Sequence, residues 1–74
     1  MNIKNRVGNR IKELRLQKKI SQEALANIAE IDRTYMTSVE NGRRNISIIN
    51  LEKIIKALDT DFKEFFNHKT FKYE

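Results

Sequence analysis

The sequence contains no cysteine and no proline, and glycine occurs only at Gly8 and Gly42. Without cysteine the chain can form neither disulfide bonds nor thiolate metal sites, so its fold must come from packing alone. No apolar run approaches the roughly 20 residues that span a membrane. Residues 1–6 also lack the apolar stretch of a signal peptide. We therefore expect a cytoplasmic protein with no membrane partner.

Residue combinations that carry catalysis or bind metal are also missing. His68 is the single histidine, and neither a second histidine nor a cysteine is present to complete a metal site. No pair of carboxylates and no nucleophile–base set stands out in the sequence. A chain of 74 residues buries only about 60% of its unfolded surface, which leaves little room for a substrate cleft. We expect no enzyme activity, no metal and no cofactor.

The positive charge is concentrated in the first part of the chain. The net charge is +5, and residues 1–44 hold ten Lys or Arg against five Asp or Glu, whereas residues 45–74 hold five of each. A polyanion is a natural partner for such a surface, because neutralising phosphates releases condensed counterions. A charge that serves solubility is the alternative, so the decision depends on the sequence motifs.

Apolar residues recur at helical spacing along the whole chain. A first stripe is formed by Ile3, Val7, Ile11 and Leu14. Polar residues that can cap a helix N-terminus precede four further stretches, and they are Ser21, Asp32, Ser47 and Asp61. The pattern predicts five helices, over residues 3–18, 22–29, 33–41, 48–58 and 62–68. Residues 69–74 either fray or extend the last helix.

These stripes predict a single small core. Gly8 lies inside the first helix, where it costs about 1 kcal/mol relative to alanine, which indicates close helix packing at that point. The predicted core consists of Val7, Ile11, Leu14, Leu25, Ala26, Ala29, Ile31, Met36, Val39, Leu51, Ile54, Ile55, Leu58, Phe62 and Phe66.

Residues 30–32 alone separate the second predicted helix from the third. Two short helices joined in this way form a helix-turn-helix unit, in which the second helix reads DNA. Met36 and Val39 must then face inward. The outward face carries small, polar or guanidinium side chains, which are Arg33, Thr34, Thr37, Ser38 and Asn41. Arginine can bond guanine O6 and N7, and the threonine methyl group can contact thymine.

The segments SQEALA, residues 21–26, and DRTYMTSVENG, residues 32–42, resemble the helix-turn-helix family of phage Cro and CI repressors. The resemblance extends from residue 7 to about residue 66. Within that family, DRTY at 32–35 and RRN at 43–45 are most similar to the controller proteins of restriction–modification systems. The resemblance implies one all-α domain over residues 1–74, with the five helices of the lambda-repressor-like fold.

The resemblance also implies roles for individual residues. Base reading falls on Arg33, Thr34 and Ser38, with Thr37 beside them. Gln22 is implied to hold a DNA phosphate, which suits the exposed N–H groups and positive dipole of a helix N-terminus. The further residues implied to lie against the DNA backbone are Tyr35, which could also lie near the operator centre, Asn41, Arg43, Arg44 and Asn45.

Three other positions matter for the geometry of this unit. The resemblance implies an ion pair between Arg15 and Glu40, which would fix the angle of the recognition helix. Glu30 and Asp59 stand where the family often has glycine. Glu30 is expected either to adopt a left-handed conformation, at a strain of order 1 kcal/mol, or to leave the turn on another path.

Aromatic residues crowd the end of the chain. They are Phe62, Phe65, Phe66, Phe71 and Tyr73. Phe62 and Phe66 can complete the core, but one small domain cannot bury all five. We expect Phe62, Phe65 and Phe66, within residues 61–74, to form a two-fold dimer contact with the fourth helix. A loose hydrophobic end is the alternative.

The sequence therefore favours a homodimeric regulator that binds double-stranded operator DNA, with two recognition helices about 34 Å apart in successive major grooves. The resemblance implies operator sites upstream of the protein's own gene, activation with RNA polymerase at low protein level, and repression at higher level. A phage or plasmid repressor of the same fold is one alternative. An antitoxin that binds a toxin protein is another.

Overall fold

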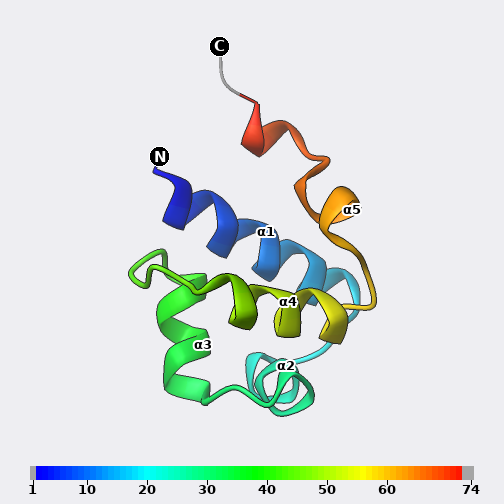
Figure 1. Ribbon diagram of the computed structural model, residues 1–74. Coiled ribbons are helices and arrows are strands. Elements are labelled where there is room, and N and C mark those ends of the chain that lie inside the picture. Colours follow the sequence, from blue (N-terminus) through cyan, green and yellow to red (C-terminus); the bar gives the residue numbers. More distant parts are fainter. Residues whose placement is uncertain (1, 73–74) are drawn as a thin grey trace.

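The computed structural model describes residues 2–72, which are entirely helical apart from the connecting turns (Figure 1). The elements are α1 (Ile3–Gln17), α2 (Gln22–Ala29), α3 (Arg33–Glu40), α4 (Ile48–Ala57), α5 (Phe62–Phe66) and the 3₁₀ helix η1 (Lys69–Phe71). The five predicted α-helices are present, and their ends differ from the prediction by at most two residues.

Side-chain caps explain where the helices begin. Ser21 accepts a hydrogen bond from the backbone N–H of Ala24 at 3.0 Å. The other three predicted caps make the same contact three residues ahead, with Asp32 at 3.1 Å, Ser47 at 3.1 Å and Asp61 at 2.8 Å. Each cap satisfies an N–H group that the helix itself cannot bond. Asn2, which the sequence analysis did not single out, caps α1 in the same way.

Left-handed residues end three of the helices. Lys19, Glu30 and Asp59 have φ between 57° and 58°, although none of them is glycine. At Glu30 this conformation lets the N–H of Ile31 reach the carbonyl oxygen of Ala26 at 2.9 Å, which closes the end of α2. Of the two alternatives for Glu30, the structure contains the left-handed one, and Asp59 adopts the same conformation.

The helix-turn-helix lies at one end of the molecule and α5 at the other (Figure 1). α1 packs against α3, while α2 packs against both α3 and α4. A Cβ atom at Gly8 would collide with the carbonyl oxygen of Val39 and lie 2.9 Å from that of Glu40. The close packing predicted at Gly8 is therefore confirmed, and it brings α1 against the backbone of α3.

The predicted aliphatic core is confirmed, with Leu14 and Ile31 half-buried at its edge. The prediction that Phe62 and Phe66 complete the core was wrong, and Phe65 takes that place. Phe65 is 0% exposed, whereas Phe62 and Phe66 are each 37% exposed. Because Phe65 is enclosed by its own chain, it cannot also form the predicted dimer contact.

Arg10 accounts for the orientation of α5. Its guanidinium donates from Nε to the carbonyl oxygen of Phe65 at 2.7 Å and from Nη2 to that of Glu64 at 3.0 Å. These bonds fasten the end of the helix to α1 and hold Phe65 toward the core. α5 has only five residues, with Phe62 at its start and Phe66 at its end. Although these two residues have helical spacing, their side chains lie at the edge of the core and remain partly exposed.

After α5 the chain returns along α1. Arg6 Nη1 donates to the carbonyl oxygen of Thr70 at 3.0 Å, and the ring of Phe71 packs 4.8 Å from that of Phe66. Residues 69–71 form η1, so this segment neither frays nor extends α5. Tyr73 and the end of the predicted dimerisation segment lie outside the described residues.

Candidate nucleic-acid interface

Helices α2 and α3 present one polar face to solvent. Met36 and Val39 are buried beneath α3, as predicted, whereas Arg33 and Thr34 are exposed and Thr37 and Ser38 are half-buried at the surface. The inward and outward sides of α3 therefore agree with the predicted helix-turn-helix arrangement.

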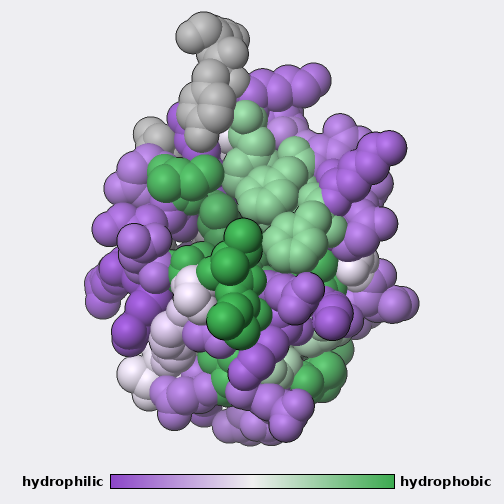
Figure 2. Space-filling view, viewed as in Figure 1, coloured by the Kyte–Doolittle hydropathy of each residue, from purple (hydrophilic) through white to green (hydrophobic). Residues whose placement is uncertain are grey.

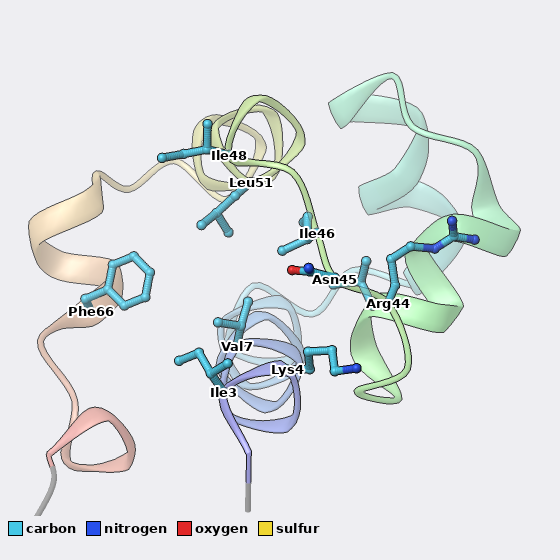
Figure 3. A pocket seen from close by; sticks show the side chains of 10 residues that line it. Ile3, Lys4, Val7, Arg44, Asn45, Ile46, Ile48, Leu51 and Phe66 are labelled. Atoms are coloured by element: carbon cyan, nitrogen blue, oxygen red, sulfur yellow. The ribbon is translucent and has the colours of Figure 1, made fainter.

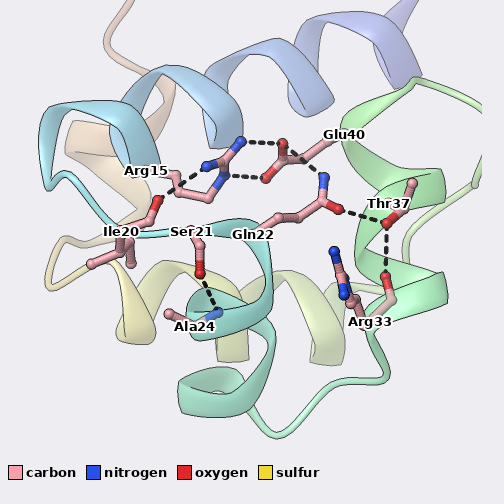
Figure 4. A network of polar contacts seen from close by, with 8 residues as sticks. All are labelled: Arg15, Ile20, Ser21, Gln22, Ala24, Arg33, Thr37 and Glu40. Atoms are coloured by element: carbon pink, nitrogen blue, oxygen red, sulfur yellow. Dashed lines mark hydrogen bonds and ion pairs between the residues drawn. The ribbon is translucent and has the colours of Figure 1, made fainter.

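A buried ion pair fixes α3 against α1. Arg15 Nε donates to Glu40 Oε2 at 2.8 Å and Arg15 Nη2 donates to Glu40 Oε1 at 3.0 Å (Figure 4). The hydrogen bonds from Arg15 to Glu40 raise the pKa of Arg15, and they outweigh burial, which lowers it. Arg15 Nη1 also donates to the carbonyl oxygen of Ile20 at 3.0 Å. The predicted pair is present, and it joins α1, α3 and the residue before the Ser21 cap.

Gln22 extends this network to the exposed face. Its Nε2 donates to Glu40 Oε1 at 3.2 Å, and its Oε1 accepts from the Thr37 hydroxyl at 2.6 Å (Figure 4). The Glu40 carboxylate fixes the orientation of the amide, because a flipped amide would place two acceptor oxygens together. The second N–H of Gln22 Nε2 bonds no other residue in the described range.

The same network determines what Thr37 can offer a base. Its hydroxyl oxygen lies 2.6 Å from Gln22 Oε1 and 3.0 Å from the carbonyl oxygen of Arg33. A hydroxyl has one proton, and both of these acceptors lie within the protein. While its proton is engaged in this way, Thr37 can accept from a base amino group or contact a thymine methyl group, and it has no second proton to donate to guanine O6.

Three arginines on this side of the molecule are held differently. Arg33 Nη1 forms an exposed ion pair with Glu23 Oε2 at 3.1 Å. The guanidinium of Arg44 lies over the ring of Tyr35, 4.6 Å from its centroid, which is the geometry of a cation–π contact. Arg43, by contrast, makes no ion pair with any residue between 2 and 72.

The loop after α3 exposes further polar groups. Asn41, Arg43, Arg44 and Asn45 are all exposed. Gly42 has φ +73°, and a Cβ atom there would collide with the side chain of Asn5. The positive φ therefore favours glycine at this position, and a larger residue would also have to displace the Asn5 side chain of α1.

Comparison with known proteins agrees with this geometry. The sequence profile of the helix-turn-helix family matches residues 11–65. The control protein C.MunI from a Mycoplasma species is 48% identical over 66 residues, which cover 88% of this chain and 89% of that protein. This chain belongs to the helix-turn-helix family of control proteins. As a member of that family, it is a DNA-binding transcriptional regulator.

Solved control-protein structures have the same fold. The restriction–modification controller protein C.AhdI from Aeromonas hydrophila matches with a TM-score of 0.81 and 43% identity, over 85% of this chain and 96% of that chain. The controller protein C.Esp1396I, solved as a tetramer in complex with its natural 35 base-pair operator, matches with a TM-score of 0.84 and 38% identity, over 89% of this chain and 87% of that chain.

Two residues near the face of α2 and α3, Glu23 and Tyr35, make contacts that were not predicted from the sequence. Glu23, in the first turn of α2, is paired with Arg33 ten positions later. Tyr35 lies beneath Arg44 and accepts a hydrogen bond from the N–H of Ser47 at 3.4 Å. Both contacts cross a turn, so helical spacing carries no signal for them. Opposite charges at the first turns of two adjoining helices could have suggested the first one.

The control protein has no grouping of side chains suited to a metal within residues 2–72. The ring nitrogens of His68 are both engaged, because Nδ1 accepts from the N–H of Thr70 at 3.0 Å and Nε2 lies 3.4 Å from Glu13 Oε1. None of the helices in this range is both long and apolar enough to cross a bilayer.

Proposed function

We propose that this control protein belongs to a restriction–modification system and regulates transcription by binding double-stranded operator DNA as a homodimer. The observation that carries the proposal is the outward face of α3, which the Arg15–Glu40–Gln22 network holds rigidly against α1 and α2. The operator complex of the related C.Esp1396I supports it. The protein acts in the bacterial cytoplasm, by binding and not by catalysis.

In the proposed complex, α3 lies in the major groove. Arg33, Thr34 and Ser38 read base edges, and Thr37 contacts a base with its methyl group or accepts from it. Gln22 binds a phosphate through its remaining N–H, at the N-terminus of α2 where the helix dipole favours an anion. The other backbone contacts are assigned to Tyr35, Asn41, Arg43, Arg44 and Asn45.

An apolar surface is proposed as the contact between protomers. Hydrophobic side chains gather where α1, α4 and α5 meet (Figure 2), and an open groove of about 290 Å³ lies among Ile3, Ile48 and Phe66 (Figure 3). Ile48 is 74% exposed and Ile49 is 67% exposed. Such an accumulation of apolar surface is unusual on a small monomer and is typical of an interface. Phe62 and Phe66 border this surface and are proposed to contribute to it.

Ile48→Glu should convert the dimer to a monomer, because it places a charge in the apolar contact. Operator affinity should fall about a hundredfold, since a monomer loses the bivalent advantage of two linked recognition helices. Sedimentation velocity and operator gel shifts measure the two effects. Ile28→Glu adds the same charge at an exposed isoleucine on α2 and should remain dimeric. A dimeric Ile48→Glu protein would contradict the proposed surface.

Arg33→Ala should weaken operator binding by about 1–3 kcal/mol and relax base preference at one position in each half-site. Arg43→Ala removes the same charge from the loop and should weaken binding to all sequences, with a shallower dependence of affinity on salt. Gel shifts over a salt series, together with selection of bound sequences from a random DNA pool, compare the two. A uniform loss in Arg33→Ala on every sequence would restrict Arg33 to phosphate contact.

The proposed regulation follows from occupancy of operator sites upstream of the protein's own gene. At low protein level the bound dimer assists RNA polymerase, and at higher level additional binding blocks the promoter. A reporter with the upstream region, measured while the protein level is titrated, should therefore show activation followed by repression. No sequence-selective gel shift with that region would reject the operator function.

A further inference from the structure

We infer that Glu23 is a specificity-determining residue, which positions Arg33 so that one edge of its guanidinium faces a guanine while the opposite nitrogen remains paired to Glu23. The inference rests on the proposed operator binding. Its test is chosen so that the two ideas can fail separately.

The first observation is the position of the pair. Glu23 lies in the first turn of α2, beside Gln22, and Arg33 is the first residue of α3. The pair therefore links the two N-terminal turns of the helix-turn-helix on the side that faces DNA. Both side chains are largely exposed, Arg33 by 64% and Glu23 by 61%, so a base edge can approach without displacing any protein group.

The second observation is which nitrogen Glu23 engages. Only Nη1 of Arg33 contacts the carboxylate, at 3.1 Å, and no other residue in the described range bonds Nε or Nη2. Those two atoms form the side-on fork of the guanidinium. Arg15 uses this same fork on Glu40, with Nε and Nη2 at 2.8 and 3.0 Å from its two oxygens. On Arg33 the fork is available for the O6 and N7 acceptors of guanine.

The third argument concerns the cost of ordering. An exposed arginine has many rotamers, and holding it in one of them on binding costs free energy. The contact with Glu23 removes part of this cost before DNA arrives. The carboxylate also keeps Arg33 from turning to a phosphate on an unrelated sequence, since a phosphate near Glu23 would be repelled.

This inference predicts that a change at Glu23 weakens binding to operator DNA and does not weaken binding to unrelated DNA. Glu23→Gln should weaken operator binding by about three- to tenfold, the range expected when a free arginine must be ordered on binding. The same change should leave binding to unrelated DNA unchanged or make it tighter, because a negative charge near phosphates is lost. Gel shifts or fluorescence anisotropy at one salt concentration measure both affinities.

Two further variants distinguish the specific effect of the Glu23–Arg33 pair from the general effect of losing one negative charge. Asp59→Asn removes one negative charge beyond the end of α4, at a left-handed position that asparagine tolerates, and should not reduce the ratio of the two affinities. In the Arg33→Ala background, Glu23→Gln should no longer weaken operator binding. Selection from a random pool should show that Glu23→Gln relaxes the guanine preference that depends on Arg33.

The outcomes are distinct. If wild-type protein forms no sequence-selective complex, the proposed operator function fails. If the wild-type protein is selective and Glu23→Gln tightens operator and unrelated DNA by the same factor, Glu23 acts only as a charge and the inference is overturned. A weakening that persists in the Arg33→Ala background would overturn it as well.

Discussion

Replacing Glu40 with glutamine should lower the free energy of unfolding by about 3–5 kcal/mol, because it leaves the Arg15 guanidinium buried without a countercharge. Both carboxylate oxygens of Glu40 are engaged by Arg15, and the Glu40 side chain is only 2% exposed. Domains of this size have a total stability of about 4–11 kcal/mol, so the loss is a large fraction. Urea unfolding followed by circular dichroism measures it.

Glu23→Gln provides the matched control for stability. It makes the same chemical change in an ion pair whose two side chains are both exposed. Exposed ion pairs contribute about 0–1 kcal/mol to the free energy of unfolding. Replacing the whole buried pair, as in Arg15→Met with Glu40→Leu, should restore most of the stability, because no unpaired charge remains. A loss below about 1 kcal/mol in Glu40→Gln would show that the pair is not needed to hold α3.

The double variant also separates stability from recognition. Without Glu40, nothing fixes the Gln22 amide, and the Thr37 proton is no longer directed inward by it. A refolded double variant should therefore bind operator less well than wild type. This result would indicate that the buried pair serves the DNA-facing residues through a defined set of hydrogen bonds, in addition to its effect on the fold.

The helices and the orientation of α3 could be predicted because their causes are local. Ser21, Asp32, Ser47 and Asp61 each cap the helix that immediately follows. Capping depends on a side chain and an N–H three positions away, so the sequence displays both partners. The buried side of α3, which contains Met36, could be predicted in the same way. The period of a helix places its apolar residues on one side, and that side packs against the core.

The features that could not be predicted depend on contacts between distant segments. Arg10 lies 55 positions before Phe65, whose carbonyl oxygen it binds. Glu23 and Arg33 meet across a turn, and Arg44 meets Tyr35 across the end of α3. The sequence suggested roles for Arg33, Arg44 and Tyr35, but the partner of each side chain depends on how the helices are placed relative to one another. That placement follows from close approaches such as the one at Gly8.

Phe65→Ala should lower the free energy of unfolding by about 3–5 kcal/mol, because it removes a fully buried ring and leaves a cavity. Phe65 is 0% exposed, and the rings of Phe66 and Phe71 pack against it at centroid distances of 4.9 and 6.1 Å. Because this ring and the Arg10 bonds anchor α5 to the core, the C-terminal segment from residue 61 to 72 should lose much of its protection against amide hydrogen exchange.

Phe66→Ala is the control that distinguishes the core from the proposed dimer surface. Phe66 is 37% exposed and lines the groove beside Ile48. If it lies between protomers, its loss should weaken association, so the effect on the unfolding midpoint should depend on protein concentration. The effect of Phe65→Ala on the stability of each protomer should persist at the lowest concentrations. Equal and concentration-independent losses in both variants would place Phe66 in the core of the single chain and remove it from the interface.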